Sequence, residues 1–123
     1  MEVKISIGVN LKVNLKKIRR YKVGLTNIEI KDMGNIQLKA NEQITFVNKK
    51  TQYDVCKKNW GYYATPSLNK RLKSFNFRSF LVKNSFNCLY LMIVEKSKIN
   101  LFHKYLKKEK NKIVKEFTNI KCK

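Results

Sequence analysis

Apolar and polar residues alternate along the first part of the chain. The apolar positions at its start are Val3, Ile5, Ile7 and Val9. A period of two is typical of a strand with one buried face. The alternation continues over 11–15 and ends in a basic run at 16–20. We therefore expect residues 1–20 to form an edge hairpin or a loosely attached basic arm.

Short segments of strand-like composition follow. They cover residues 21–25, 27–31, 36–39, 43–47 and 52–57. Turns are predicted at 32–35, where Gly34 can adopt a positive φ, and at 48–51. Several short strands at close spacing predict a small, strongly bent antiparallel sheet that resembles half a barrel.

A loop rich in aromatic residues, 59–64, separates this sheet from a predicted helix. Thr65 is a typical N-cap residue and Pro66 a typical first helical residue, so the pattern predicts a helix over 66–75. Asn76 suits the left-handed conformation with which many helices end.

The last third of the chain predicts two strands and a second helix. The strands are expected at 77–83 and 87–94, and both faces of the second are apolar, which favours a central strand covered on both sides. Ser97 is expected to cap the last helix, whose apolar positions share one face and whose pattern breaks near 110–111. Those positions are Ile99, Phe102, Leu106, Ile113 and Phe117. The tail 118–123 is expected to fray.

Together these elements predict an α+β fold in which a small N-terminal antiparallel sheet precedes a β-loop-α-β-β-α unit. The chain has 123 residues and a hydrophobic content of 43%. A chain of this length suits a single domain, because two separate cores would each be small.

The apolar segments and the cysteines bear on location. The longest apolar run, 88–94, is far shorter than the roughly 20 residues of a membrane-spanning helix, so no span is expected. Cys56, Cys88 and Cys122 stand far apart, His103 is the single histidine, and no secretory leader is visible. We therefore expect no metal site, reduced thiols and a soluble, cytoplasmic protein.

The net charge of +20 arises from 28 basic and 8 acidic residues. Such a charge attracts nucleic acid, an anionic membrane surface or an acidic partner. A compositional origin stays open, because 24 of the basic residues are lysines and AT-rich coding sequences favour Lys, Asn and Ile. The four arginines are then more informative, since guanidinium binds anions in a bidentate manner.

The best candidate for a binding site is the segment 60–71. Its polar and aromatic members are Trp60, Tyr62, Tyr63, Thr65, Ser67, Asn69 and Arg71. In one interpretation Trp60 and Tyr63 stack on a sugar or base, while Ser67, the backbone of the helix start and Arg71 bind an anion. In the other, the aromatic rings plug the sheet and Thr65 only caps the helix.

The same stretch, WGYYATPSLNKRL over 60–72, resembles a family of small bacterial proteins with the signature W-G-[FY]-Y-A-T-P-S-x-N-x-R-L. The chain departs from the family at Asn76, where glycine is expected, and at Lys70, where a small residue is common. The resemblance implies a setting in surface-polysaccharide metabolism, and it carries no established activity.

Little in the sequence suggests catalysis. Ser67 and Lys70 form an S-x-x-K pattern, but in a chain this rich in lysine about one such match is expected by chance. The glycines are isolated and form no phosphate-binding loop. We therefore predict no catalytic residue, no cofactor and a non-catalytic accessory or small-ligand-binding domain, with a sugar or phosphate-bearing ligand at 60–71. The alternative is a nucleic-acid-binding protein. The sequence does not indicate which oligomeric state the protein adopts.

Overall fold

The computed structural model describes residues 3–7 and 11–123, and the predicted apolar position Val9 lies outside them. The chain divides into two compact units. Unit 1 comprises Met1–Ile44 and Val55–Tyr63, and unit 2 comprises Thr45–Asp54 and Ala64–Lys123.

Strands outnumber helices in the described residues. The elements follow in the order β1 (Val3–Ile7), β2 (Leu11–Val23), β3 (Ile28–Gln37), β4 (Gln43–Asn48), β5 (Thr51–Lys58), β6 (Gly61–Ala64), α1 (Arg71–Ser74), β7 (Phe77–Lys83), β8 (Leu89–Glu95), the 3-10 helix η1 (Lys96–Lys98), α2 (Ile99–Glu109) and β9 (Lys112–Glu116). They form three-stranded sheets in the orders β1-β2-β3, β4-β5-β6 and β8-β7-β9. In this coarse sense the predicted α+β class is confirmed.

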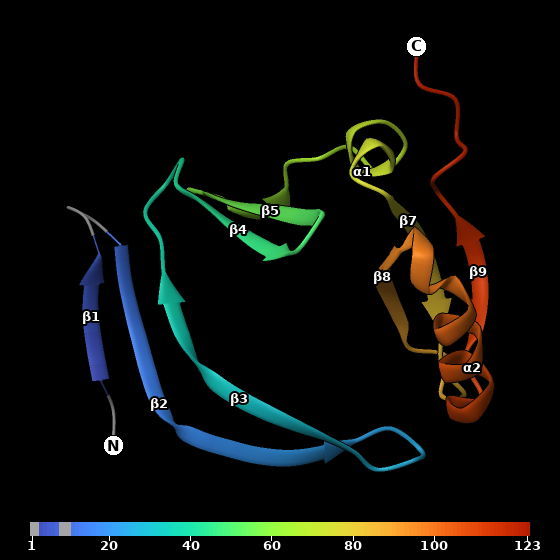
Figure 1. Cartoon of the computed structure of the whole chain (residues 1–123), viewed down its shortest axis with the longest axis horizontal. Helices are drawn as coiled ribbons and strands as arrows, with labels where there is room; N and C mark the ends of the chain where they lie inside the picture. The colour runs from blue at the N-terminus through green and yellow to red at the C-terminus, as the bar shows by residue number, and fades with distance from the viewer. Residues whose placement is uncertain (1–2, 8–10) are drawn as a thin grey trace. The chain divides into compact units, whose positions relative to one another are not determined.

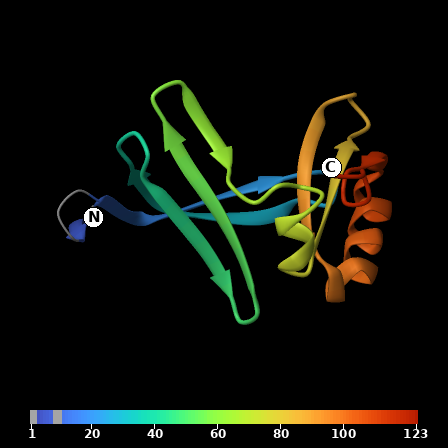
Figure 2. The same ribbon diagram turned by 90° about the horizontal axis from the view of Figure 1, so that it is seen from above.

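In unit 1, β2 and β3 form a long antiparallel ribbon that both views display (Figures 1 and 2). The prediction of a turn at 32–35 is wrong, because β3 runs through these residues. Gly34 does have a positive φ of 136°, but it lies opposite Leu15 at a register shift between the strands. A Cβ at Gly34 would collide with the carbonyl oxygen of Asn14, so glycine here permits a close approach of two strands rather than a reversal.

Unit 2 contains the apolar core. β7 lies between β8 and β9, and α2 runs alongside this sheet (Figure 1). The rings of Phe80 on β7 and Phe102 on α2 lie 5.1 Å apart between centroids. The buried cluster consists of Phe80, Val82, Val94, Phe102 and Leu106, with Met92 and Ile99 packed against it.

The prediction that the strand at 87–94 is central and covered on both sides is wrong. β8 is an edge strand, and its first residues Leu89, Tyr90 and Leu91 are exposed. The central position belongs to β7, because β9 pairs along its other side.

β9 arises where the sequence pattern predicted the end of the last helix. The expected break near 110–111 is confirmed, since α2 ends at Glu109 and Lys110 adopts a left-handed conformation with φ of 55°. Ile113 therefore lies on a strand and not on the helix. Ile113 and Val114 are β-branched residues, which favour strands. Ser97 does not cap α2, because the N-cap residue is Lys98 and it makes no side-chain capping bond.

The first helix is also shorter than predicted. α1 begins at Arg71 with Lys70 as its N-cap, so Thr65 and Pro66 precede it. The backbone N–H of Thr65 donates to the carbonyl of Asp54, and the chain bends at Thr65 and Pro66 instead of starting a helix. Asn76 has a φ of 66°, as predicted for the residue after the helix.

We predict that Phe80→Ala destabilises the protein by about 3–5 kcal/mol, because Phe80 is 1% exposed at the centre of the core. Urea unfolding measures this loss. Phe86→Ala is the matched control, since Phe86 is 76% exposed, and it should cost within about 0.5 kcal/mol. Equal losses in the two variants would contradict this description of the core.

Acid should weaken an ion pair between β7 and β9. Nε and Nη2 of Arg78 donate to Glu116 at 2.8 and 2.7 Å, and the hydrogen bond from Arg78 lowers the pKa of Glu116. Since the folded-state pKa is lowered, the stabilisation is present above the ordinary value of about 4.5 and disappears as pH falls through the lowered value.

Glu116→Gln should therefore cost about 1 kcal/mol at neutral pH, a value reduced by the partial exposure of the pair. Below the ordinary pKa of glutamate, the variant should lose less further stability than the wild type. Urea unfolding at several pH values measures both effects. A constant difference between the two proteins down to strongly acidic pH would refute the role given to this pair.

Candidate functional site

The aromatic residues of the predicted site lie in unit 1 and are open to solvent. Trp60 follows β5 in a turn, and Tyr62 and Tyr63 lie on β6. Trp60 is 70% exposed and Tyr62 is 64% exposed, so neither ring fills the interior of a sheet. Single exposed rings are ordinary, as Phe86 at 76% exposure illustrates, but several exposed rings side by side form a surface suited to contact with another molecule.

Two of these rings lie against each other. The centroids of Trp60 and Tyr63 are 6.1 Å apart with an angle of 28° between the ring planes, a stacked arrangement. The ammonium group of Lys57 lies 5.1 Å from the centroid of Tyr62. We call Lys57, Trp60, Tyr62 and Tyr63 the aromatic surface. It combines flat apolar faces with a positive charge.

The polar residues of the predicted site lie in unit 2, and their groups already have partners in the chain. The hydroxyl of Ser67 accepts the backbone N–H of Arg71 at 3.0 Å. The side-chain amide of Asn69 donates to the carbonyl of Ile120 at 2.8 Å. Thr65 is held through its backbone by Asp54. These side chains therefore stabilise the fold around α1.

Arg71 is engaged as well. Its Nη2 lies 3.7 Å from Oδ2 of Asp54, and its guanidinium stands over the ring of Phe75 at 5.6 Å. The Asp54 side chain is only 3% exposed, and its Oδ1 makes no hydrogen bond. A buried carboxylate needs a nearby cation, so Arg71 compensates Asp54.

The other arginines follow the same rule. Each of the four arginines of the chain forms an ion pair with a carboxylate in the structure. The pairs are Arg19–Asp32, Arg20–Glu29, Arg71–Asp54 and Arg78–Glu116. The arginines, which the sequence singled out as the best anion ligands, are thus engaged within the chain.

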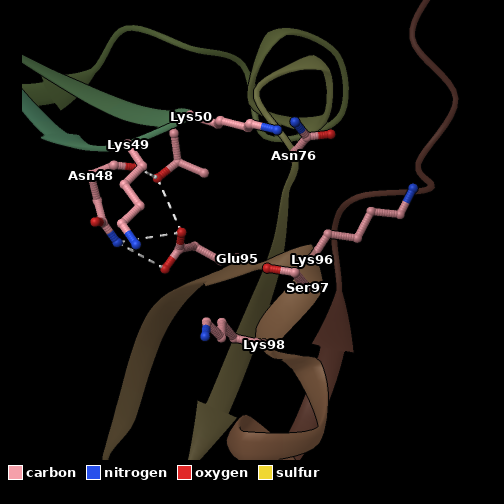
Figure 3. A pocket seen from close by; sticks show the side chains of 9 residues that line it. Asn48, Lys49, Lys50, Asn76, Glu95, Lys96, Ser97 and Lys98 are labelled. Carbon is pink, nitrogen blue, oxygen red and sulfur yellow. Dashed lines mark hydrogen bonds between the residues drawn. The ribbon is translucent and has the colours of Figure 1, made fainter.

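A cavity of about 600 Å³ lies in unit 2, away from the residues predicted from the sequence (Figure 3). Its walls come from the turn between β4 and β5, from the residue after α1, and from the junction of β8 with η1. The lining residues are Asn48, Lys49, Lys50, Thr51, Asn76, Glu95, Lys96, Ser97 and Lys98. Sequence reasoning identified 48–51 only as a turn. The sequence signal for this cavity was two short segments that each contain two lysines. Lysine is frequent throughout the chain, so this signal did not stand out.

The structure offers no metal site in residues 3–7 and 11–123, where His, Cys, Asp and Glu form no group of three. Cys56 is buried, Cys88 and Cys122 are exposed, and all three thiols are free. Of the helices that the structure describes, none is both long and apolar enough to cross a membrane.

The chain matches no known protein-family model, no curated protein and no solved structure. The candidate site is therefore interpreted from its own residues.

The pairing of Arg71 with Asp54 predicts a structural cost for its loss. Arg71→Ala should destabilise the protein by about 1–3 kcal/mol, because it leaves the buried carboxylate of Asp54 without a cation. The cost stays below that of a fully buried pair because the Arg71 side chain is half exposed. In an Asp54→Asn background the same substitution should cost less. Urea unfolding of the four proteins of this cycle gives the coupling energy, with Lys73→Ala on α1 as the control. A loss at Arg71 no larger than at Lys73 would show that the pair is unimportant.

Proposed function

We propose that the protein is a cytoplasmic, non-catalytic binding protein whose ligand is a sugar or a phosphate-bearing molecule with flat rings. The observation that carries the proposal is the exposed, stacked pair of Trp60 and Tyr63. The prediction of a loop at 59–64 is wrong in its second part, because Tyr63 lies on β6, a strand of the β4-β5-β6 sheet, and Trp60 lies in the turn before it. The resemblance of 60–72 to the bacterial signature suggests surface-polysaccharide metabolism as the setting.

The chemistry of the aromatic surface supports a ring-bearing ligand. The apolar face of a sugar ring and the face of a base both stack on Trp and Tyr, whose polar tips then orient the ligand. A pair of rings that already lie against each other loses little conformational freedom when a ligand binds. Lys57 beside Tyr62 adds attraction for an anionic substituent.

Nucleic acid is the second candidate, and the charge favours it. The net charge of +20 and the lysines 57 and 58, next to the exposed rings, suit a single strand whose bases stack on aromatic side chains. The two candidates differ in salt dependence. Binding to a phosphate backbone weakens steeply as salt rises because counterions are released, whereas stacking on a neutral sugar changes little.

Trp60 is the only tryptophan, so its fluorescence reports directly on the aromatic surface. We expect quenching when the protein is titrated with its ligand class, and we suggest neutral oligosaccharides, acidic oligosaccharides and oligodeoxynucleotides as probes, each at low and at high salt. Tyr63→Ala keeps the reporter and removes its stacking partner. It should weaken binding about tenfold, because stacking on one aromatic ring contributes about 1–3 kcal/mol.

Phe86→Ala is the matched control, since it removes another exposed ring and should leave the affinity unchanged. Salt-independent quenching by oligosaccharides supports the first candidate, and quenching by oligodeoxynucleotides that high salt abolishes supports the second. If no probe quenches Trp60, or if Tyr63→Ala and Phe86→Ala behave alike, the aromatic surface is not a binding site.

A further inference from the structure

The cavity of unit 2 has the size of a small-ligand site, and its lining is polar and charged. Its volume of about 600 Å³ falls within the range of about 300–1,000 Å³ that is typical of such sites. Lys49 and Lys50 approach it from the turn between β4 and β5, and Glu95 and Ser97 face it from the junction of β8 with η1 (Figure 3). Segments far apart in sequence thus line one open cavity.

The charges around the cavity are unbalanced. Four lysines line it against one glutamate. Among the residues that the structure describes, none of these four lysines forms an ion pair. Their ammonium groups therefore have no internal ionic partner to lose when they donate to an anion. Figure 3 shows the side chain of Lys96 extending away from Glu95, so its ammonium group reaches an anion in the cavity after a rotation of its flexible side chain. These lysines are Lys49, Lys50, Lys96 and Lys98.

The single carboxylate of the cavity is engaged by neutral donors. The side-chain amide of Asn48 lies 3.5 and 3.3 Å from the two carboxylate oxygens of Glu95. The hydroxyl of Thr51 lies 3.2 Å from Oε1 of Glu95 and 3.0 Å from the carbonyl of Asn48. These bonds fix Glu95 in the wall and join the turn to the end of β8. They leave the lysines as the donors that remain for a ligand.

The helix start adds partial positive charge beside the cavity. The helical run of η1 and α2 begins at the cavity, and neither Glu95 nor Lys98, the N-cap residues of its two parts, makes a side-chain capping bond. The N–H of Lys96 donates to the carbonyl of Asn76, which ties the helix start to another wall. The first N–H groups of a helix carry partial positive charge, and this supplements the lysines.

From this combination we propose that the cavity binds a phosphate group, either inorganic phosphate or the phosphate of a small sugar phosphate. Phosphate is compact, carries between one and two negative charges near neutral pH, and accepts several hydrogen bonds at once, which suits a cavity lined by several lysines. The cavity also leaves room for a sugar-sized substituent. This site shares no residue with the aromatic surface, so it is independent of the function proposed above.

The test is isothermal titration calorimetry of the full chain with inorganic phosphate, a hexose phosphate and the unphosphorylated hexose. The wild type should bind both phosphates with a saturable isotherm, and removal of cavity lysines should weaken this binding without changing any binding of the free hexose, which belongs to the aromatic surface. Tighter binding of the hexose phosphate than of phosphate identifies a sugar phosphate as the ligand, and equal binding identifies the phosphate group alone. Phe86→Ala removes an exposed ring that belongs to neither site, and it should leave the phosphate affinities unchanged.

Matched variants distinguish binding at the cavity from a general effect of the protein's net charge. Lys50→Gln with Lys98→Gln should weaken phosphate binding about tenfold or more, because charge-assisted hydrogen bonds are lost. Lys112→Gln with Lys115→Gln removes the same charge from exposed β9 and should change the affinity by less than about twofold. Glu95→Gln should tighten binding, because it removes the one negative charge of the cavity and keeps an acceptor for Asn48.

The proposal is overturned if the phosphates give no saturable binding to the wild type. It is also overturned if the two lysine pairs weaken binding equally, or if Glu95→Gln weakens it in a protein whose urea unfolding is unchanged.

Discussion

The scarcity of carboxylates is the constraint on which the rest of this structure depends. The chain has 8 acidic residues against 28 basic ones. Each of its four arginines pairs with one of those acids, and the acid in the pair with Arg71 is buried. The planar guanidinium holds a carboxylate better than an ammonium group does, so the arginines are the natural internal partners. The excess charge is then concentrated on lysines, most of which are exposed, and this is the physical basis for expecting an anionic ligand.

Local patterns predicted many of the strands and the turn at 48–51, because alternation and turn residues act over a few positions. The order of strands in a sheet depends on contacts between distant segments. β8 is apolar on both faces, yet it lies at an edge of its sheet, and β7 takes the central position between β8 and β9. Likewise, the left-handed Lys110 converts what looks like a continuing helix into a strand. Lys110 ends α2, and the β-branched residues that follow it pair with β7 as β9.

The candidate site was predictable to different degrees in its parts. The aromatic surface could be located from sequence, because Trp60, Tyr62 and Tyr63 stand together in a chain where such density is unusual. The engagement of Ser67 and Arg71 was not predictable, since it depends on Asp54 and on where α1 begins. The cavity was missed because its walls are separated by more than forty positions, and because its lysines look like the many others in the chain.

Selective labelling of side chains, read by mass spectrometry, tests most directly whether lysines and not arginines serve external anions. Lysine and arginine reagents are applied to the wild type with and without a hexose phosphate. The account predicts that the ligand protects Lys49, Lys50, Lys96 and Lys98 and leaves the reactivity of Arg71 unchanged. Protection of Arg71 with no change at the four lysines would contradict it.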